Sequence, residues 1–229
     1  MNPQSLRFHT LTLALAAVAL TPRAAAATLD DIQFWTGSGL HRAALVIDWK
    51  TDDTPSSLVW GFRWDGEASG MDMLLAVVAA DSRLFAHLGQ FDWGTALLGV
   101  GYDLNHDGAF AVEPGLSFEG SGLSWNVGSG AANDSRTAVG GADLYREGWN
   151  TGFWSYHLRG SSSGDWEGAV TGAAGRSLAD GVWDGYSFAP GFVGLAPSEP
   201  VAALVPEPGM LSLLAFGSLI LACTRPRRS

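Results

Sequence analysis

Two apolar segments, one near each end, limit how much of this chain can fold into a soluble domain. Near the N-terminus, Arg7 precedes an apolar run at 11–20, and small alanines follow at 24–27. A positive start, an apolar stretch of about ten residues and small residues at the cleavage region are typical of a secretory signal peptide. A membrane span needs ~20 apolar residues. We therefore expect a signal helix in residues 1–27, removed by signal peptidase just before Thr28.

The C-terminal segment 205–229 combines a proline motif, an apolar run and a basic end. The motif consists of Val205, Pro206, Glu207 and Pro208. Residues 210–223 are uncharged and almost wholly apolar, and the chain closes on Arg225, Arg227 and Arg228. Basic residues after an apolar segment hold that end in the cytoplasm. We predict a C-terminal transmembrane helix with the body outside, although a run of about 14 residues covers only ~21 Å of the ~30 Å hydrocarbon core and needs snorkelling arginines.

This order of V-P-E-P motif, short apolar helix and arginine-rich end resembles the PEP-CTERM sorting signal. The resemblance covers the last 25 or so residues of the chain. It implies recognition by an exosortase, a membrane protease-transpeptidase of Gram-negative bacteria, and removal of the tail near 206–208. It also implies an inner-membrane-anchored precursor whose body is passed to the cell surface or the extracellular matrix. Bacteria with this system typically make exopolysaccharide.

The body between the two end segments is acidic and has no cysteine. Residues 28–204 hold 8 Lys and Arg against 22 Asp and Glu, a net charge of about −14 with histidine neutral. Such a surface repels nucleic-acid phosphates and attracts divalent cations, so we expect no nucleic-acid partner. The single cysteine, Cys223, lies in the C-terminal apolar run. A disulfide is therefore excluded from the body, and core packing must hold the fold.

Most of the body has the pattern of short strands separated by polar turns. Segments 43–49 and 58–64 are rich in β-branched and aromatic residues, and 96–103, 149–158 and 182–188 also indicate strands. From 115 to 146 the chain is rich in Gly and Ser, with short strand-like pieces such as 123–127.

A single segment, 71–80, predicts a helix, because Ser69 and Asp72 approximate a capping box before an apolar run. The expected fold is therefore mainly β with one packed helix, an α+β body built as an antiparallel sheet or a sandwich. We place this domain at 28–188 and a Pro/Ala-rich linker at 189–204, ahead of the sorting segment.

The sequence D-L-N-H-D-G at 103–108 is the strongest metal candidate. Oxygen-bearing side chains two residues apart can converge on one hard cation, and the glycine allows a sharp turn. The expected calcium ligands are Asp103, Asn105, Asp107, the backbone carbonyl of Ala109, and Glu113. The second half departs from the calcium-loop pattern, since Pro114 stands where a bidentate Glu is expected. The alternative is a tight hairpin turn in which Asp-Gly is only conformational.

The body also contains all ten tryptophans of the chain. Most aromatic side chains at strand spacing belong to a core, where each buries a large area. The candidates for stacking on sugar rings are Trp154, Trp183 and Tyr186. Ligand binding of this kind would suit an exopolysaccharide environment.

No catalytic motif is recognisable in the body. G-S-S-S-G at 160–164 matches the nucleophile pattern only in letters, because no strand and helix flank it. The expected function is a non-enzymatic, exported surface or matrix protein that is processed by exosortase and stabilised by calcium. The alternatives are a secreted carbohydrate-binding module and a polysaccharide hydrolase with a carboxylate pair that only the fold can reveal.

Overall fold

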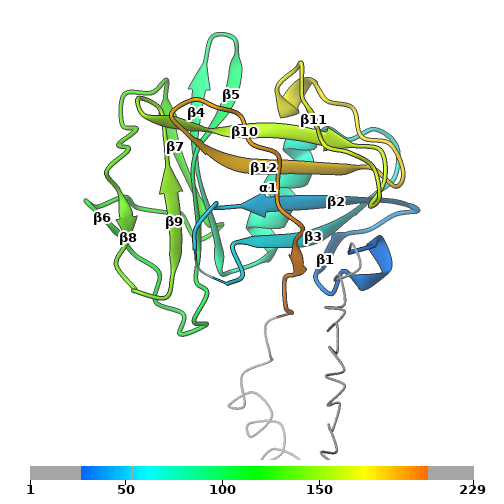
Figure 1. Ribbon diagram of the computed structural model, residues 1–229, viewed down its shortest axis with the longest axis horizontal. Coiled ribbons are helices and arrows are strands. Elements are labelled where there is room, and N and C mark those ends of the chain that lie inside the picture. Colours follow the sequence, from blue (N-terminus) through cyan, green and yellow to red (C-terminus); the bar gives the residue numbers. More distant parts are fainter. Residues whose placement is uncertain (1–26, 53, 206–229) are drawn as a thin grey trace, which may run out of the picture.

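The computed structural model describes residues 27–52 and 54–205, and this part of the chain forms three β-sheets around one α-helix (Figure 1). The expected mainly β body with one packed helix is therefore confirmed. The signal segment, residues 206–208 of the proline motif, the apolar run and the terminal arginines lie outside the described residues. Among the described residues, no helix is long and apolar enough to cross a membrane.

The large sheet has seven strands in the order β1-β3-β2-β12-β10-β11, with β13 also paired to β3. Its strands are β1 (Trp35–Gly37), β2 (His41–Asp48), β3 (Ser57–Trp64), β10 (Gly152–Arg159), β11 (Glu167–Gly168), β12 (Trp183–Pro190) and β13 (Val201–Ala202). Antiparallel pairs join β2 to β3 and β10 to β12, but β12 runs parallel to β2. The sheet is thus mixed rather than wholly antiparallel, because the long connection between β2 and β12 permits a parallel crossover.

The small sheet has four strands in the order β7-β4-β5-β9. They are β4 (Leu84–Phe91), β5 (Gly94–Tyr102), β7 (Leu123–Val127) and β9 (Leu144–Glu147), and a separate pair consists of β6 (Val112–Glu113) and β8 (Thr137–Ala138). The strands of the small sheet run across the direction of those in the large sheet (Figure 1). The β4–β5 hairpin rises on the side of the body opposite to the two ends of the described chain (Figure 1).

Helix α1 (Gly70–Ala80) packs against both sheets through β3 and β4. The predicted capping box is confirmed: the backbone N–H of Asp72 donates to Ser69 Oγ at 3.1 Å, and Ser69 N–H donates to Asp72 Oδ2 at 2.8 Å. Each bond satisfies a backbone N–H that the first helical turn leaves free. The helix buries Met73, Leu74 and Val77 in a core that it shares with the tryptophans of β3 and β10.

Residues 191–205, which we call the strap, cross the outer face of the large sheet in front of β10, β12 and β2 (Figure 1). The sequence predicts a linker here, but the strap is bonded to the body. Ser198 N–H donates to Asp48 Oδ2 at 2.7 Å, and Lys50 Nζ donates to the carbonyl of Ala196 at 2.8 Å. Pro197 and Pro200 are buried. One face of β2 joins the main core, and on the other face Ala44 and Val46 pack in a second apolar cluster with Ile32 and Trp183. Strand β2 is therefore buried almost throughout, which explains its continuous apolar sequence.

Both ends of the described chain close the same edge of the large sheet. Strand β1 pairs with one half of β3 and β13 with the other half. Ala27 N–H donates to Glu199 Oε1 of the strap at 2.6 Å. The two ends therefore leave the body on one side (Figure 1).

Candidate functional site

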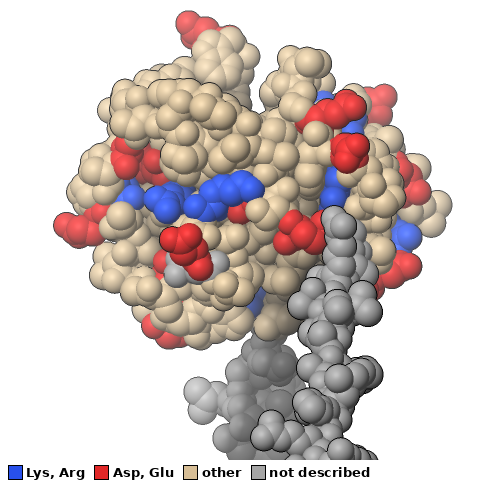
Figure 2. Space-filling model, in the orientation of Figure 1, with Lys and Arg blue, Asp and Glu red and all other residues tan. Residues whose placement is uncertain are grey.

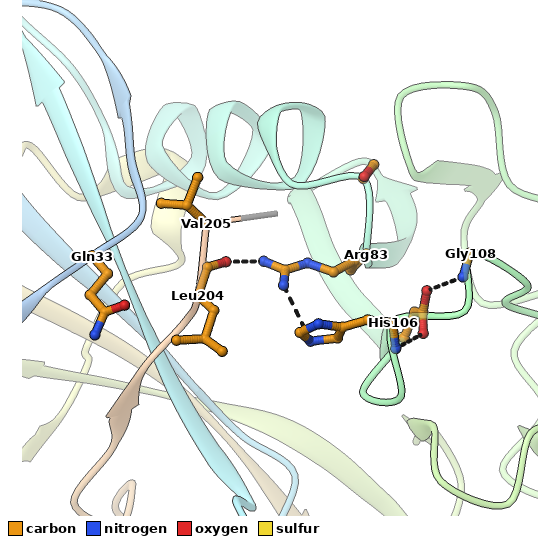
Figure 3. Close-up of a pocket in the computed structure, with 8 residues that line it drawn as sticks. Gln33, Arg83, His106, Gly108, Leu204 and Val205 are labelled. Atoms are coloured by element: carbon orange, nitrogen blue, oxygen red, sulfur yellow. Dashed lines mark hydrogen bonds between the residues drawn. The ribbon is translucent and has the colours of Figure 1, made fainter. Parts of the chain in front are cut away.

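An open cavity of about 560 Å³ lies between the 103–108 loop and the end of the strap (Figure 3). It is lined by Gln33, Ser82, Arg83, Asp103, His106, Gly108, Leu204 and Val205. The loop and the sorting motif, which the sequence analysis treats as separate features, thus meet at one place. Val205 is the first residue of the V-P-E-P motif, and it is also the last described residue.

Arg83 joins the two walls of this cavity. Its Nε donates to Asp81 Oδ1 at 2.8 Å and its Nη2 to Asp81 Oδ2 at 2.9 Å. The same Nη2 also donates to the backbone carbonyl of Leu204, and Nη1 lies 3.3 Å from His106 Nε2 (Figure 3). Because Asp81 and Arg83 are both buried, this ion pair is shielded from water and geometrically fixed.

The 103–108 loop is held by its own side chains. Asp103 is buried, and its two carboxylate oxygens accept backbone N–H groups of His106 at 2.8 Å and Gly108 at 2.9 Å. Asn105 Oδ1 accepts the N–H of Asp107 at 2.9 Å, and Asp107 Oδ1 accepts the N–H of Ala109 at 2.8 Å. Such bonds from Asx side chains to nearby backbone define a tight loop.

His106 has a left-handed backbone conformation, with φ of 62°. Few residues other than glycine adopt this region, although histidine is more frequent there than most. The N–H bond from His106 to Asp103 fixes this conformation, and the imidazole then reaches Arg83 (Figure 3). Gly108, with φ of 76°, completes the turn, as its position in the motif predicts.

The structure brings Asp103, Asn105, Asp107 and Ala109 together in one loop but places Glu113 on β6, where it is exposed and paired with Thr137. Over residues 27–52 and 54–205, no three His, Cys, Asp or Glu side chains form a ready metal centre. The carboxylates of Asp103 and Asp107 face the N–H groups of the loop itself. A bound cation would therefore have to compete with these bonds.

Asp143 is a residue of this region that sequence reasoning missed. It lies just before β9, and its side chain is buried, but neither carboxylate oxygen has a hydrogen-bond partner of normal geometry. Burial, together with the charges of Asp103 and Asp107, raises the pKa of Asp143, while nearby N–H groups of the loop oppose the shift. No local signal could have found it, because it comes from a turn far along the chain.

The three side chains expected to stack on sugars are all buried. Trp183 is fully buried under Arg159, whose guanidinium carbon lies 4.3 Å from the ring. Trp154 packs edge-on against Trp49, and Tyr186 stacks on Tyr156 with ring centroids 4.8 Å apart. Their positions at strand spacing place them in the core, which is the commoner role of such aromatic residues.

A different aromatic group is accessible at the β4–β5 hairpin. Trp93 is 69% exposed and stacks on Phe91 with centroids 4.6 Å apart, and Phe91 stacks on Trp149 at 4.9 Å. Beside the stack, Thr95 donates a hydrogen bond to Gln90 at 2.9 Å. The stack holds Trp93 in place and leaves much of its surface in water.

The most extensive polar cluster centres on Glu147 of β9, whose side chain is fully buried. Its oxygens accept from Tyr145 Oη at 2.6 Å, Arg136 Nη1 at 2.9 Å and the N–H of Asn133 at 2.7 Å, and His87 Nδ1 lies 3.2 Å away. Burial alone would raise the pKa of Glu147, but these bonds outweigh it and lower the pKa. Each oxygen is engaged in holding the loop before β9 to the small sheet.

Charge is unevenly distributed on the face that carries the strap. Figure 2 shows acidic side chains dispersed over this face, a short row of basic side chains on its left half, and further basic side chains scattered elsewhere. No family model matches the chain, and no curated protein or solved structure is similar to it.

Proposed function

We propose that this chain is an exported, non-enzymatic surface or matrix protein whose C-terminal tail is removed by an exosortase. One observation carries the proposal: the strap is bonded to the body up to Leu204, so the V-P-E-P motif begins at the surface of the folded domain. Ala203 N–H donates to the carbonyl of Val59 at 3.0 Å, and the side chains of Leu204 and Val205 are about half exposed.

This arrangement suits a protease that acts close to a folded domain. A protease binds an extended peptide, and a peptide that is already held extended loses less entropy on binding. Both ends of the described chain leave on one side (Figure 1), so a membrane anchor there would leave the opposite side of the body free.

The buried carboxylates support a structural rather than a hydrolytic role. Glu147 holds Arg136, Tyr145 and a backbone N–H. Asp134 holds the turn before β10 by accepting backbone N–H groups of Trp149 at 3.0 Å and Asn150 at 2.8 Å. A glycoside hydrolase needs two carboxyl groups free to face a sugar, at a separation of about 5–10 Å.

Deletion of residues 206–229 tests the sorting proposal. The truncated chain should still be secreted through the inner membrane but should lose membrane retention, because the apolar run and the arginines are gone. Replacement of residues 206–208 by alanine is the matched control: that chain should stay anchored and uncut. A truncated chain that remains in the membrane fraction contradicts the proposal.

Calcium stabilisation is the second part of the proposal: Asp143 replaces Glu113 among the candidate ligands, beside Asp103, Asn105, Asp107 and Ala109. A cation would have to draw these groups together, because they are not arranged as a metal centre in the described residues. A cation there would relieve the repulsion between these carboxylates, and the two buried oxygens of Asp143 have no hydrogen-bond partner of normal geometry, although the N–H groups of Leu104 and Asn105 are near. Calcium favours such oxygen donors, and extracellular sites often bind at only ~10⁻⁴–10⁻³ M.

Thermal unfolding with EDTA and with calcium tests this part. Calcium should raise the melting temperature of the body, and Asp143→Asn should abolish most of the rise. Glu113→Gln is the control and should keep it, because Glu113 is exposed on β6. A melting temperature that does not respond to calcium rejects the metal and leaves the sorting proposal intact.

Carbohydrate binding is the alternative function, and the exposed Trp93 stack favours it. The apolar face of a sugar ring can lie on an indole; Gln90 and Thr95 of the same hairpin are already bonded, Thr95 to Gln90 Oε1 and Gln90 Nε2 to the carbonyl of Phe91. Binding of the body to the exopolysaccharide of its own source bacterium tests this function. Trp93→Ala should remove the binding, whereas Leu40→Ala, at an exposed apolar side chain outside the β4–β5 hairpin, should not. Equal binding by both variants excludes this surface.

A further inference from the structure

Arg83 contacts residues far outside its own turn. It lies between α1 and β4, yet its guanidinium reaches the carbonyl of Leu204 in the strap and the imidazole of His106 in the loop (Figure 3). These two partners belong to the parts of the chain on either side of the cavity. The side chain thus links the start of the sorting motif to the 103–108 loop.

The guanidinium is held rigidly from behind. Asp81 accepts two of its bonds and also accepts Trp60 Nε1–H at 2.9 Å, so the carboxylate itself is fixed by the core. The guanidinium carbon lies 5.3 Å from the centre of the Tyr102 ring. An arginine fixed in this way transmits its position to whatever it bonds, because its planar fork has little freedom left.

Stability alone is a weak reason for this arrangement. Removing two charges from water is costly, and a buried ion pair is often no more stable than well-packed apolar residues of similar size. The ion pair with Asp81 holds the guanidinium of Arg83 against the backbone of Leu204, and this contact is a more specific role than a contribution to stability. Leu204 comes immediately before the V-P-E-P motif.

We propose that Arg83 is a positioning residue for the processing of the tail: it fixes the backbone at Leu204, directly before the V-P-E-P motif that the protease would recognise. This inference rests on the proposed exosortase function. Through His106, the same guanidinium ties the position of the strap end to the conformation of the 103–108 loop. The guanidinium of Arg83 is therefore fixed by His106 of the loop on one side and by Asp81 on the other.

The experiment follows processing of the full-length chain in the exporting bacterium. The fraction cut near 206–208 is measured over time, and the new C-terminus is read from the mass of the released body. Arg83→Lys retains a charge for Asp81 but cannot hold Asp81, His106 and Leu204 together. Loss of a charge-assisted hydrogen bond predicts processing roughly tenfold slower, with a wider spread of cut positions.

Two further variants separate positioning from folding. Asp81→Asn combined with Arg83→Met removes both buried charges together, so it avoids an unpaired Asp81 and should also be processed slowly. Lys50→Met loosens the strap at Ala196 and Ser198 without touching Leu204. Even if its melting temperature falls as much as that of Arg83→Lys, Lys50→Met should be processed at nearly the wild-type rate and at the wild-type bond.

The outcomes are distinct. Wild-type processing of Arg83→Lys, or an equal slowing by Lys50→Met, overturns the role of Arg83 and leaves the exosortase proposal standing. A wild-type chain that is not cut near 206–208 overturns the exosortase proposal and this inference together. His106→Ala should slow processing by a smaller factor, because it removes one support of the guanidinium and leaves the bond to Leu204 intact.

Discussion

The outer faces of the two sheets are each covered by irregular chain, but they differ in how their buried polar groups are satisfied. On the small sheet, the carboxylate of Glu147 accepts bonds from Tyr145, Arg136 and the N–H of Asn133, and the unpartnered oxygens belong to Asp143, just before β9. On the outer face of the large sheet, atoms of His157, Arg159, Trp183 and Ser187 have no hydrogen-bond partner, although Arg159 Nη1 lies 3.8 Å from Glu199 Oε2 of the strap. Unpartnered buried groups lower the stability of the arrangement that buries them. We therefore expect that displacing the strap from the large sheet requires less free energy than displacing the chain that covers the small sheet.

The largest expected effect comes from breaking the small-sheet cluster. Glu147→Ala leaves Arg136 buried without its carboxylate, and the free energy of unfolding should fall by about 3–5 kcal/mol. Urea unfolding of the body measures this loss. Glu113→Ala is the control and should change stability by less than about 0.5 kcal/mol, because the side chain is exposed. Similar small losses for both variants would remove the distinction between the two covers.

A smaller loss is expected when the strap is loosened. Lys50→Met removes the bonds of Nζ to Ala196 and Ser198, at 2.8 and 2.9 Å, and its ion pair with Asp48 at 2.8 Å. The N–H groups of Lys50 and Ser198 still bond the Asp48 carboxylate, and Lys50 is partly exposed, so the loss should be smaller than for Glu147. We expect a loss of about 1–3 kcal/mol, which is typical for hydrogen bonds that involve a charged group. Limited proteolysis should show earlier cutting at 191–200 than at any site in the small sheet. Cutting first in residues 128–136 would reverse the comparison.

The smallest effect concerns pH and contrasts Glu147 with Asp184 of β12. Burial raises the pKa of Asp184, and the bond from Tyr156 and the nearby guanidinium of Arg176 only partly oppose it, so the folded state favours the protonated form. Asp184→Asn should therefore stabilise the body above pH ~4, by on the order of 1 kcal/mol, and lose that advantage at lower pH. Unfolding measured between pH 3 and 7 checks this prediction.

The pKa of Glu147 is shifted in the opposite direction from that of Asp184. Its pKa is lowered in the folded body, so it contributes stability above the pKa of an ordinary glutamate, ~4.3, and loses it as the pH falls through the folded value. Glu147→Gln should therefore be most damaging at neutral pH. Parallel pH profiles for Asp184→Asn and Glu147→Gln would contradict the assignment of the two carboxylates.

Elements with local signals were predictable from the sequence, and contacts between distant segments were not. The apolar strings of β2 and β3 and the Ser69–Asp72 capping box identify their elements directly. Strand β4 was missed because its sequence, L-F-A-H-L-G-Q-F, has no clear alternation. The strap has the composition of a linker, and its partners, Asp48, Lys50 and Arg83, come from much earlier in the chain.

The candidate site could likewise be predicted from the sequence only where its signal is local. The local pattern at 103–108 was enough to predict a tight loop ending at Gly108, and the structure has one. Asp143 and Arg83 reach that loop only after folding, so spacing gave no sign of them. Burial of Trp154, Trp183 and Tyr186 follows from their place in central strands, which the sequence could not rank against exposed ones.

The most direct measurement of the central claim is the intact mass of the protein recovered from outside the inner membrane of its source bacterium. A body that begins at or near Thr28 and ends close to residues 206–208, allowing for the mass of a group transferred to its new end, is the predicted result. A recovered protein that still carries the arginines and Ser229 would show that the tail is no sorting signal and would contradict the account.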